Sequence, residues 1–236
     1  SDFDEKISML PDNIRNMPKY REIERKLQSA QSVPFPVLVS GCINYPGDID
    51  RYNFYGRAGD TVVIEVFGRR LGWPIDSLIR LKTMDKVVAW NDDVNQDFEH
   101  GLLTHHADSY LMTKLPVSGN YTVEISDSQN HGGNQYKYFL RISNPLPDFQ
   151  LIVCPSEINI SENSASLIKV YAIKKDGWDG DIQLRLKNLP ETFVLDGPTI
   201  PEGRDSIRLT LRTSSRYTDE IFFPVLEGRA IIDGKE

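Results

Sequence analysis

The sequence predicts an all-β protein, with two antiparallel β-sandwiches that follow a short N-terminal helical or extended segment. From Val33 onward, apolar residues recur at every second position, which is the period of a half-buried strand. The 236 residues include 16 glycines and 14 prolines, many of them at turns between the short apolar runs. No helices of the spacing found in α/β proteins separate these runs, so antiparallel pairing is expected.

The first 32 residues lack this alternation. Pro18 suits the first turn of a helix, where its missing N–H costs nothing. The apolar residues that follow at helical spacing are Tyr20, Ile23, Leu27 and Ala30. We therefore expect residues 1–32 to form one short amphipathic helix over 19–31, or an extended linker, that docks onto the next domain.

Residues 33–145 contain the first set of alternating strands. Turn signals such as Pro46-Gly47-Asp48 and Ser118-Gly119-Asn120 separate them. Such alternation places one face of a sheet in the core and the other in water. The alternating residues are Tyr52 and Phe54; Val62, Ile64 and Val66; Tyr121, Val123 and Ile125; and Tyr136, Tyr138, Leu140 and Ile142.

Pro145 and Pro147 mark the expected domain boundary, because two prolines so close together do not fit inside a central strand. Alternation resumes through 146–236, and its strand number fits a small immunoglobulin-like sandwich. The alternating residues here are Phe149, Leu151 and Val153; Ile168, Val170 and Ala172; Ile182, Leu184 and Leu186; and Ile207, Leu209 and Leu211.

Composition and charge exclude several classes of protein. A net charge of −7 argues against a protein that binds nucleic acid by neutralising phosphates. No apolar run reaches the ~20 residues that span a bilayer, so no membrane insertion is expected. We expect half-buried thiols at Cys42 and Cys154 in preference to a disulfide, and a monomer. The start lacks a leader and an initiator Met, which suggests a processed or excised chain.

The common catalytic motifs are missing from the sequence, including G-x-S-x-G, H-E-x-x-H, the P-loop and C-x-x-C. His105, His106, Asp108 and Ser109 stand close together, which suggests a catalytic triad. Triads are assembled across a fold, however, and adjacent histidines on a strand point to opposite faces. We therefore expect surface or structural histidines, and a protein that is not an enzyme.

An acidic segment from Asp85 to Asp108 carries six carboxylates against Lys86, a formal charge of −5. Such carboxylates repel one another unless a cation or solvent compensates, and Ca²⁺ binds oxygen ligands in flexible loops. The candidate ligands are Asn91, Asp92, Asp93 and Asp108. Asp48 and Asp50 offer two further carboxylates. The alternative is that these residues only form turns, because no EF-hand spacing is present.

The three tryptophans suggest a platform that stacks on sugars or binds a protein. Trp73 and Trp178 lie in turns rich in glycine, proline and aspartate, so they are the candidate ligand-binding residues. Trp90 ends the apolar run Val87–Trp90, where burial is expected instead.

Several motifs between residues 33 and 143 occur in the order of a known family. They include G-D-I-D-R-Y-N-F (47–54), N-D-D (91–93), S-G-N-Y-T-V (118–123) and Y-K-Y-F-L-R (136–141). This region resembles the bacterial pre-peptidase C-terminal domain, which is similar to the collagen-binding domains of clostridial collagenases. The resemblance implies a jelly-roll-like β-sandwich that is non-catalytic and that serves binding, targeting or maturation beside a secreted enzyme.

The second half extends this resemblance. T-H-H-A-D-S-Y (104–110) and the turn D-G-W-D-G-D-I (176–182) resemble segments of large secreted bacterial proteins, in which an immunoglobulin-like domain follows. The resemblance implies a longer parent chain and a secreted, periplasmic or cell-surface location. The partners it implies are an extracellular protein or polysaccharide and other domains of the same chain.

The resemblance also implies a calcium site. In the collagenase relatives, an E-x-E-x-N segment supplies ligands together with aspartates of the following turn. Glu22 and Glu24 match the two glutamates, and Asp48 and Asp50 match the aspartates, but Lys26 replaces the asparagine.

These patterns leave three hypotheses for function. The first is a non-catalytic accessory segment that binds a protein or glycan surface, or that spaces domains. The second is a calcium-stabilised module in which the metal clamps residues 1–32. The third is a carbohydrate-binding module that uses an exposed tryptophan.

Overall fold

The computed structural model describes residues 2–21, 30–84, 86–93, 107–214 and 221–235. The chain divides into two compact units, Ser1–Leu146 and Pro147–Glu236. The boundary between them in the sequence falls within the predicted Pro145–Pro147 stretch. Described strands dominate both units, which confirms the all-β fold class.

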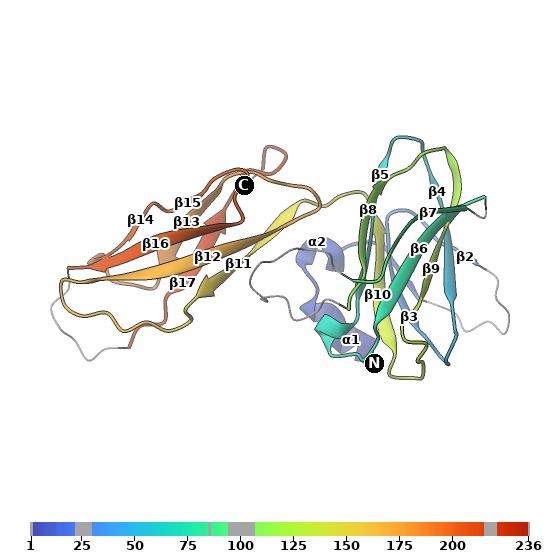
Figure 1. Cartoon of the computed structure of the whole chain (residues 1–236), viewed down its shortest axis with the longest axis horizontal. Coiled ribbons are helices and arrows are strands. Elements are labelled where there is room, and N and C mark those ends of the chain that lie inside the picture. Colours follow the sequence, from blue (N-terminus) through green and yellow to red (C-terminus); the bar gives the residue numbers. More distant parts are fainter. Residues whose placement is uncertain (1, 22–29, 85, 94–106, 215–220, 236) are drawn as a thin grey trace. The chain divides into compact units, whose positions relative to one another are not determined.

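The first unit is a sandwich of two five-stranded sheets (Figure 1). Its strands are β1 (Lys19–Arg21), β2 (Gln31–Ser32), β3 (Val37–Cys42), β4 (Asp50–Gly56), β5 (Thr61–Phe67), β6 (Ser77–Thr83), β7 (Lys86–Asn91), β8 (Tyr110–Lys114), β9 (Gly119–Asp127) and β10 (Lys137–Ser143). Its helices are α1 (Asp2–Lys6), η1 (Ile7–Met9), α2 (Asp12–Arg15) and η2 (Arg69–Leu71).

The order of strands is that of a jelly roll with an added edge strand on each sheet. Sheet A has the order β1-β3-β10-β5-β8, and sheet B has the order β2-β4-β9-β6-β7. Strands β3 to β10 pair with one another only in the antiparallel sense, and the chain crosses repeatedly between the two sheets. β1 and β2 pair parallel with β3 and β4.

The predicted helix over 19–31 is wrong at both of its described ends. Residues 19–21 form β1 and residues 31–32 form β2, with the Tyr20 hydroxyl donating to the Gln31 side chain over 2.9 Å. Residues 22–29 lie outside the described residues. The open edges of β3 and β4 offer backbone hydrogen bonds, which outweigh a weak helical pattern. The extended alternative fits these ends, while the short helices lie earlier, within residues 2–15.

Both faces of the central strands of sheet A are buried. β5 and β10 are buried at nearly every position, whereas β4 and β6 of sheet B alternate between buried and partly exposed residues. The N-terminal segment covers the side of sheet A that faces away from the sandwich core, where the Phe3 ring centroid lies 5.4 Å from those of Trp73 and Phe139. No described segment covers the outer face of sheet B in this way, and the outward positions of β4 and β6 are partly exposed.

A buried network of charges accompanies this two-sided burial. Glu65 accepts hydrogen bonds from Arg70 at 2.9 Å and from Arg141 at 3.1 Å. Asp108, fully buried, accepts from the Arg70 guanidinium at 2.7 Å and from the backbone N–H groups of residues 68–70. Two positive and two negative groups therefore compensate each other, and Asp108 holds the turn that contains η2.

The second unit is a separate sandwich with its own core. Its strands are β11 (Asp148–Cys154), β12 (Ala165–Lys175), β13 (Ile182–Lys187), β14 (Phe193–Asp196), β15 (Thr199–Ile200), β16 (Ser206–Thr213) and β17 (Val225–Arg229). The four-stranded sheet β11-β12-β16-β14 has the A-B-E-D order of an immunoglobulin constant-type domain. The other sheet, β15-β13-β17, departs from the C-F-G set, because β13 at position C is the central strand and β15 precedes β16, the strand at position E. The immunoglobulin-like assignment therefore stays a prediction.

The Asp108 network predicts a large loss of stability on Asp108→Asn. The substitution leaves the buried Arg70 with less compensating charge, so the free energy of unfolding of the first unit should fall by about 3–5 kcal/mol. Urea unfolding measures this loss. The control is Asp12→Asn, which breaks an exposed pair with Arg15 and should barely move the midpoint. Equal midpoints for the two variants would contradict the role of Asp108.

Candidate functional site

The outer face of sheet B carries the candidate site. Trp90 of β7, Arg80 of β6, Glu124 of β9 and Arg51 of β4 are direct cross-strand neighbours in one row. Lys82 lies in the next row, two residues along β6 from Arg80. We call these five residues the open face.

A β-bulge turns Trp90 outward. The register between β6 and β7 shifts at Leu81/Lys82, so Val88 is an additional residue opposite Leu81. Val88 packs against the core, yet Trp90, two residues further on, is 60% exposed. The predicted burial of Trp90 is therefore wrong, because the apolar run Val87–Trp90 contains no signal for an inserted residue.

Glu124 joins two cations at the centre of the open face. Its carboxylate accepts a hydrogen bond from Arg51 at 3.0 Å and pairs with the Lys82 ammonium at 2.7 Å. Burial alone would raise the pKa of Glu124. The hydrogen bonds and positive charges of Lys82 and Arg51 outweigh burial and hold this pKa below its usual value.

Arg80 and Trp90 are the two members of the open face whose side chains form no hydrogen bond or ion pair with a described residue. No described residue forms a hydrogen bond or ion pair with the Arg80 guanidinium, and none forms a hydrogen bond with the Trp90 N–H or a ring-stacking contact with its indole. The face thus presents an apolar ring beside an uncompensated cation.

The predicted platform tryptophans are placed differently. Trp73 is only 5% exposed, and its indole N–H donates to Asp2 at 2.9 Å. Trp178 is half-buried and stacks on Phe149 with ring centroids 5.6 Å apart, while Gly180 leaves room for its ring. The expected exposure of Trp73 is therefore wrong, and Trp178 mainly completes the core of the second unit.

Only two of the four residues in the first proposed calcium site can be located, because Glu22 and Glu24 lie outside the described residues. Asp48 accepts the backbone N–H of Asn44 at 2.8 Å. Asp50 is buried and accepts the Tyr138 hydroxyl at 2.5 Å.

Two members of the second cluster, Asn91 and Asp108, accept hydrogen bonds from backbone N–H groups. The Asn91 side-chain oxygen accepts the backbone N–H of Tyr110 at 2.9 Å, and Asp108 serves Arg70 and η2 as described above. In the described ranges, no three His, Cys, Asp or Glu side chains group closely enough to hold a metal ion.

Of the four residues that suggested a triad, the structure describes Asp108 and Ser109, because His105 and His106 lie outside the described residues. Ser109 is buried, and its hydroxyl bonds to the hydroxyl of Ser77 at 2.8 Å. Asp108 and Ser109 therefore brace the segment that leads into β8. Cys42 and Cys154, both described, form no disulfide and are half-buried.

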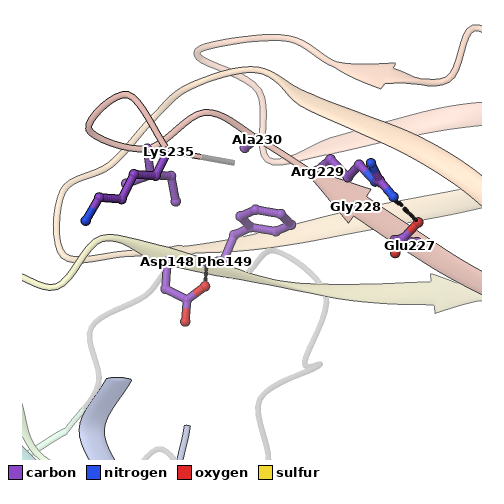
Figure 2. Close-up of a pocket in the computed structure, with 8 residues that line it drawn as sticks. Asp148, Phe149, Glu227, Gly228, Arg229, Ala230 and Lys235 are labelled. Atoms are coloured by element: carbon purple, nitrogen blue, oxygen red, sulfur yellow. Dashed lines mark hydrogen bonds and ion pairs between the residues drawn. The ribbon is translucent and has the colours of Figure 1, made fainter. Parts of the chain in front are cut away.

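Each unit also contains an open groove. In the second unit, a groove of about 430 Å³ lies between β11 and β17. Figure 2 shows Phe149 directed from β11 toward Gly228, with Arg229 paired to Glu227 nearby. In the first unit, a groove of about 460 Å³ lies at the end of β4. Its lining includes Val33, Phe35, Tyr55, Arg57, Asp60 and Asn144. The charged groups that line both grooves are of mixed sign.

Comparison with known proteins gives a partial sequence relative and solved structures of low overall similarity. No family model matches the chain. A "Probable subtilase-type serine protease" of Deinococcus radiodurans is 35% identical over 83 residues, which are 34% of this chain and 10% of the protease. The chain therefore spans about a tenth of that relative. A solved pre-peptidase C-terminal domain of a collagenase from Bacillus anthracis aligns with a TM-score of 0.37 and 14% identity, over 51% of this chain and 100% of that domain.

The Glu124 ion pairs predict a specific pH dependence. Because the pKa of Glu124 is lowered on folding, its stabilisation is present above the unfolded value near 4.5 and is lost as pH falls through the folded value. Melting temperature should fall more steeply below pH 4.5 for the natural chain than for Glu124→Gln.

The control for this measurement is Glu157→Gln. Glu157 is exposed and forms no ion pair with a described residue, so this variant should follow the natural chain. Parallel curves for the natural chain and Glu124→Gln would contradict the ion pairs.

Proposed function

We propose that the chain is a non-catalytic accessory segment of a larger secreted bacterial protein, which binds an extracellular polymer through the open face. The observation that carries this proposal is the exposed Trp90 ring beside the unengaged Arg80. Aromatic and arginine side chains dominate the binding energy of protein interfaces. The polymer is a protein or a polysaccharide at the cell surface or outside the cell.

The subtilase relative supports the accessory role. Its similarity to this chain is confined to a tenth of the protease, as expected of a module that different large proteins share. The second unit, which has its own sandwich core, would then bind a further surface or separate neighbouring domains. None of the described helices is long and apolar enough to cross a membrane.

Trp90→Ala tests the binding role. Co-sedimentation with insoluble collagen, chitin, cellulose and pectin should show binding to at least one of them, weakened about tenfold or more by the substitution. Phe223→Ala is the control, since Phe223 is an 81% exposed ring in the second unit. Binding that is unchanged in Trp90→Ala, or absent for all four polymers, would contradict the proposal.

A structural calcium site at Asp48 and Asp50 is a second proposal. The charge of Asp48, followed by burial, a hydrogen bond to Asp48 and the charge of Asp50, raises the pKa of Tyr45. This local negative charge favours a cation at the turn, to which Glu22 and Glu24 would contribute from the N-terminal segment.

Calcium binding predicts a higher melting temperature in millimolar Ca²⁺ than in EDTA, because a ligand of the folded state stabilises it by mass action. The increase should be smaller in Asp48→Asn, and Mg²⁺ should not replace Ca²⁺ at the same concentration. Coincident melting in Ca²⁺ and EDTA would exclude the site.

A further inference from the structure

The five residues of the open face together carry a net positive charge, although the whole chain has a net charge of −7. It contains three cations, Arg51, Arg80 and Lys82, and one carboxylate, Glu124, which leaves a formal charge of +2. Arg51 and Lys82 share the charge of Glu124. Arg80 has no charged partner among the described residues, so the cation nearest to Trp90 is the uncompensated one.

Trp90 and Arg80 lie next to each other on the outer face of sheet B. They are paired directly across β6 and β7, where Cβ atoms lie about 4.5–5.5 Å apart. The row from Trp90 to Arg51 crosses three inter-strand steps of about 4.8 Å, or about 14 Å in total. The row is therefore long enough to contact a short run of sugar rings.

We propose that the open face binds an acidic polysaccharide, whose sugar rings carry carboxylates. This inference rests on the proposed function and names the class of its ligand. One ring would pack its apolar C–H face on Trp90, and its carboxylate would accept two hydrogen bonds from the Arg80 guanidinium. Arg51 and Lys82 would contact the next carboxylate along the row.

Other polymers fit the same residues less well. A neutral polysaccharide leaves Arg80 without an anion. An acidic peptide offers carboxylates but no flat ring face for Trp90.

The test compares polygalacturonate with its methyl-esterified form, which keeps the same rings and lacks the charge. Calorimetric titrations in EDTA, so that Ca²⁺ does not cross-link the polymer, should show at least about tenfold tighter binding to the charged form. Added NaCl should weaken only the binding of the charged form. Polyglutamate and single-stranded DNA should bind more weakly than polygalacturonate.

Two variants separate charge from stacking. Arg80→Gln should weaken binding to polygalacturonate about tenfold without changing binding to the ester, whereas Trp90→Ala should weaken both. Arg208→Gln is the control for charge, because Arg208 is an exposed strand residue of the second unit without a described partner. Phe223→Ala is the control for an exposed ring.

The outcomes distinguish this inference from the proposed function. Equal binding to both forms with loss in Trp90→Ala would overturn the acidic ligand and keep the binding face. Unchanged binding in Trp90→Ala would overturn both. Binding to polyglutamate or DNA as tight as to polygalacturonate, or failure to bind polygalacturonate at all, would overturn the polysaccharide assignment.

Discussion

The first unit depends on the burial of sheet A from both sides. Its inner face packs in the sandwich, and its outer face lies under the N-terminal segment, with Phe3 against Trp73 and Phe139. A charged group on such a sheet loses its water on either side, so Glu65 and Arg141 are stable only as partners. Arg70 and Asp108 complete a neutral set and fasten the η2 turn.

The same asymmetry creates the open face. The described part of the N-terminal segment covers sheet A, whereas the outward polar positions of β4 and β6 in sheet B remain partly exposed. The bulge in β7 then adds a tryptophan to a face that is otherwise polar and charged. A rigid sheet holds these side chains in fixed rows, which suits recognition of an extended polymer better than a mobile loop would.

The carboxylates at turns show why acidic composition alone does not identify a metal site. Asp127 accepts the backbone N–H groups of Asp76, Gln129 and His131, and Asp108 accepts those of η2. In both cases a carboxylate satisfies amides that have no strand partner, as Asx residues commonly do in turns. Asp108, one of the carboxylates that suggested a cation, is thus used within the first unit. Asp48 and Asp50, beside Tyr45, remain the place where a cation is proposed.

The sequence by itself determined the all-β class, because alternation such as Tyr121, Val123 and Ile125 depends only on the two-residue period of a strand. It also indicated where in the sequence the first unit ends and the second begins, because prolines such as Pro145 and Pro147 limit strand pairing wherever they occur. The tertiary structure decided which aromatic rings are exposed. Trp73 is buried because a segment 70 residues earlier covers it, and Trp90 is exposed because the register with β6 contains an additional residue. Both effects depend on contacts between distant segments, which local periodicity does not encode.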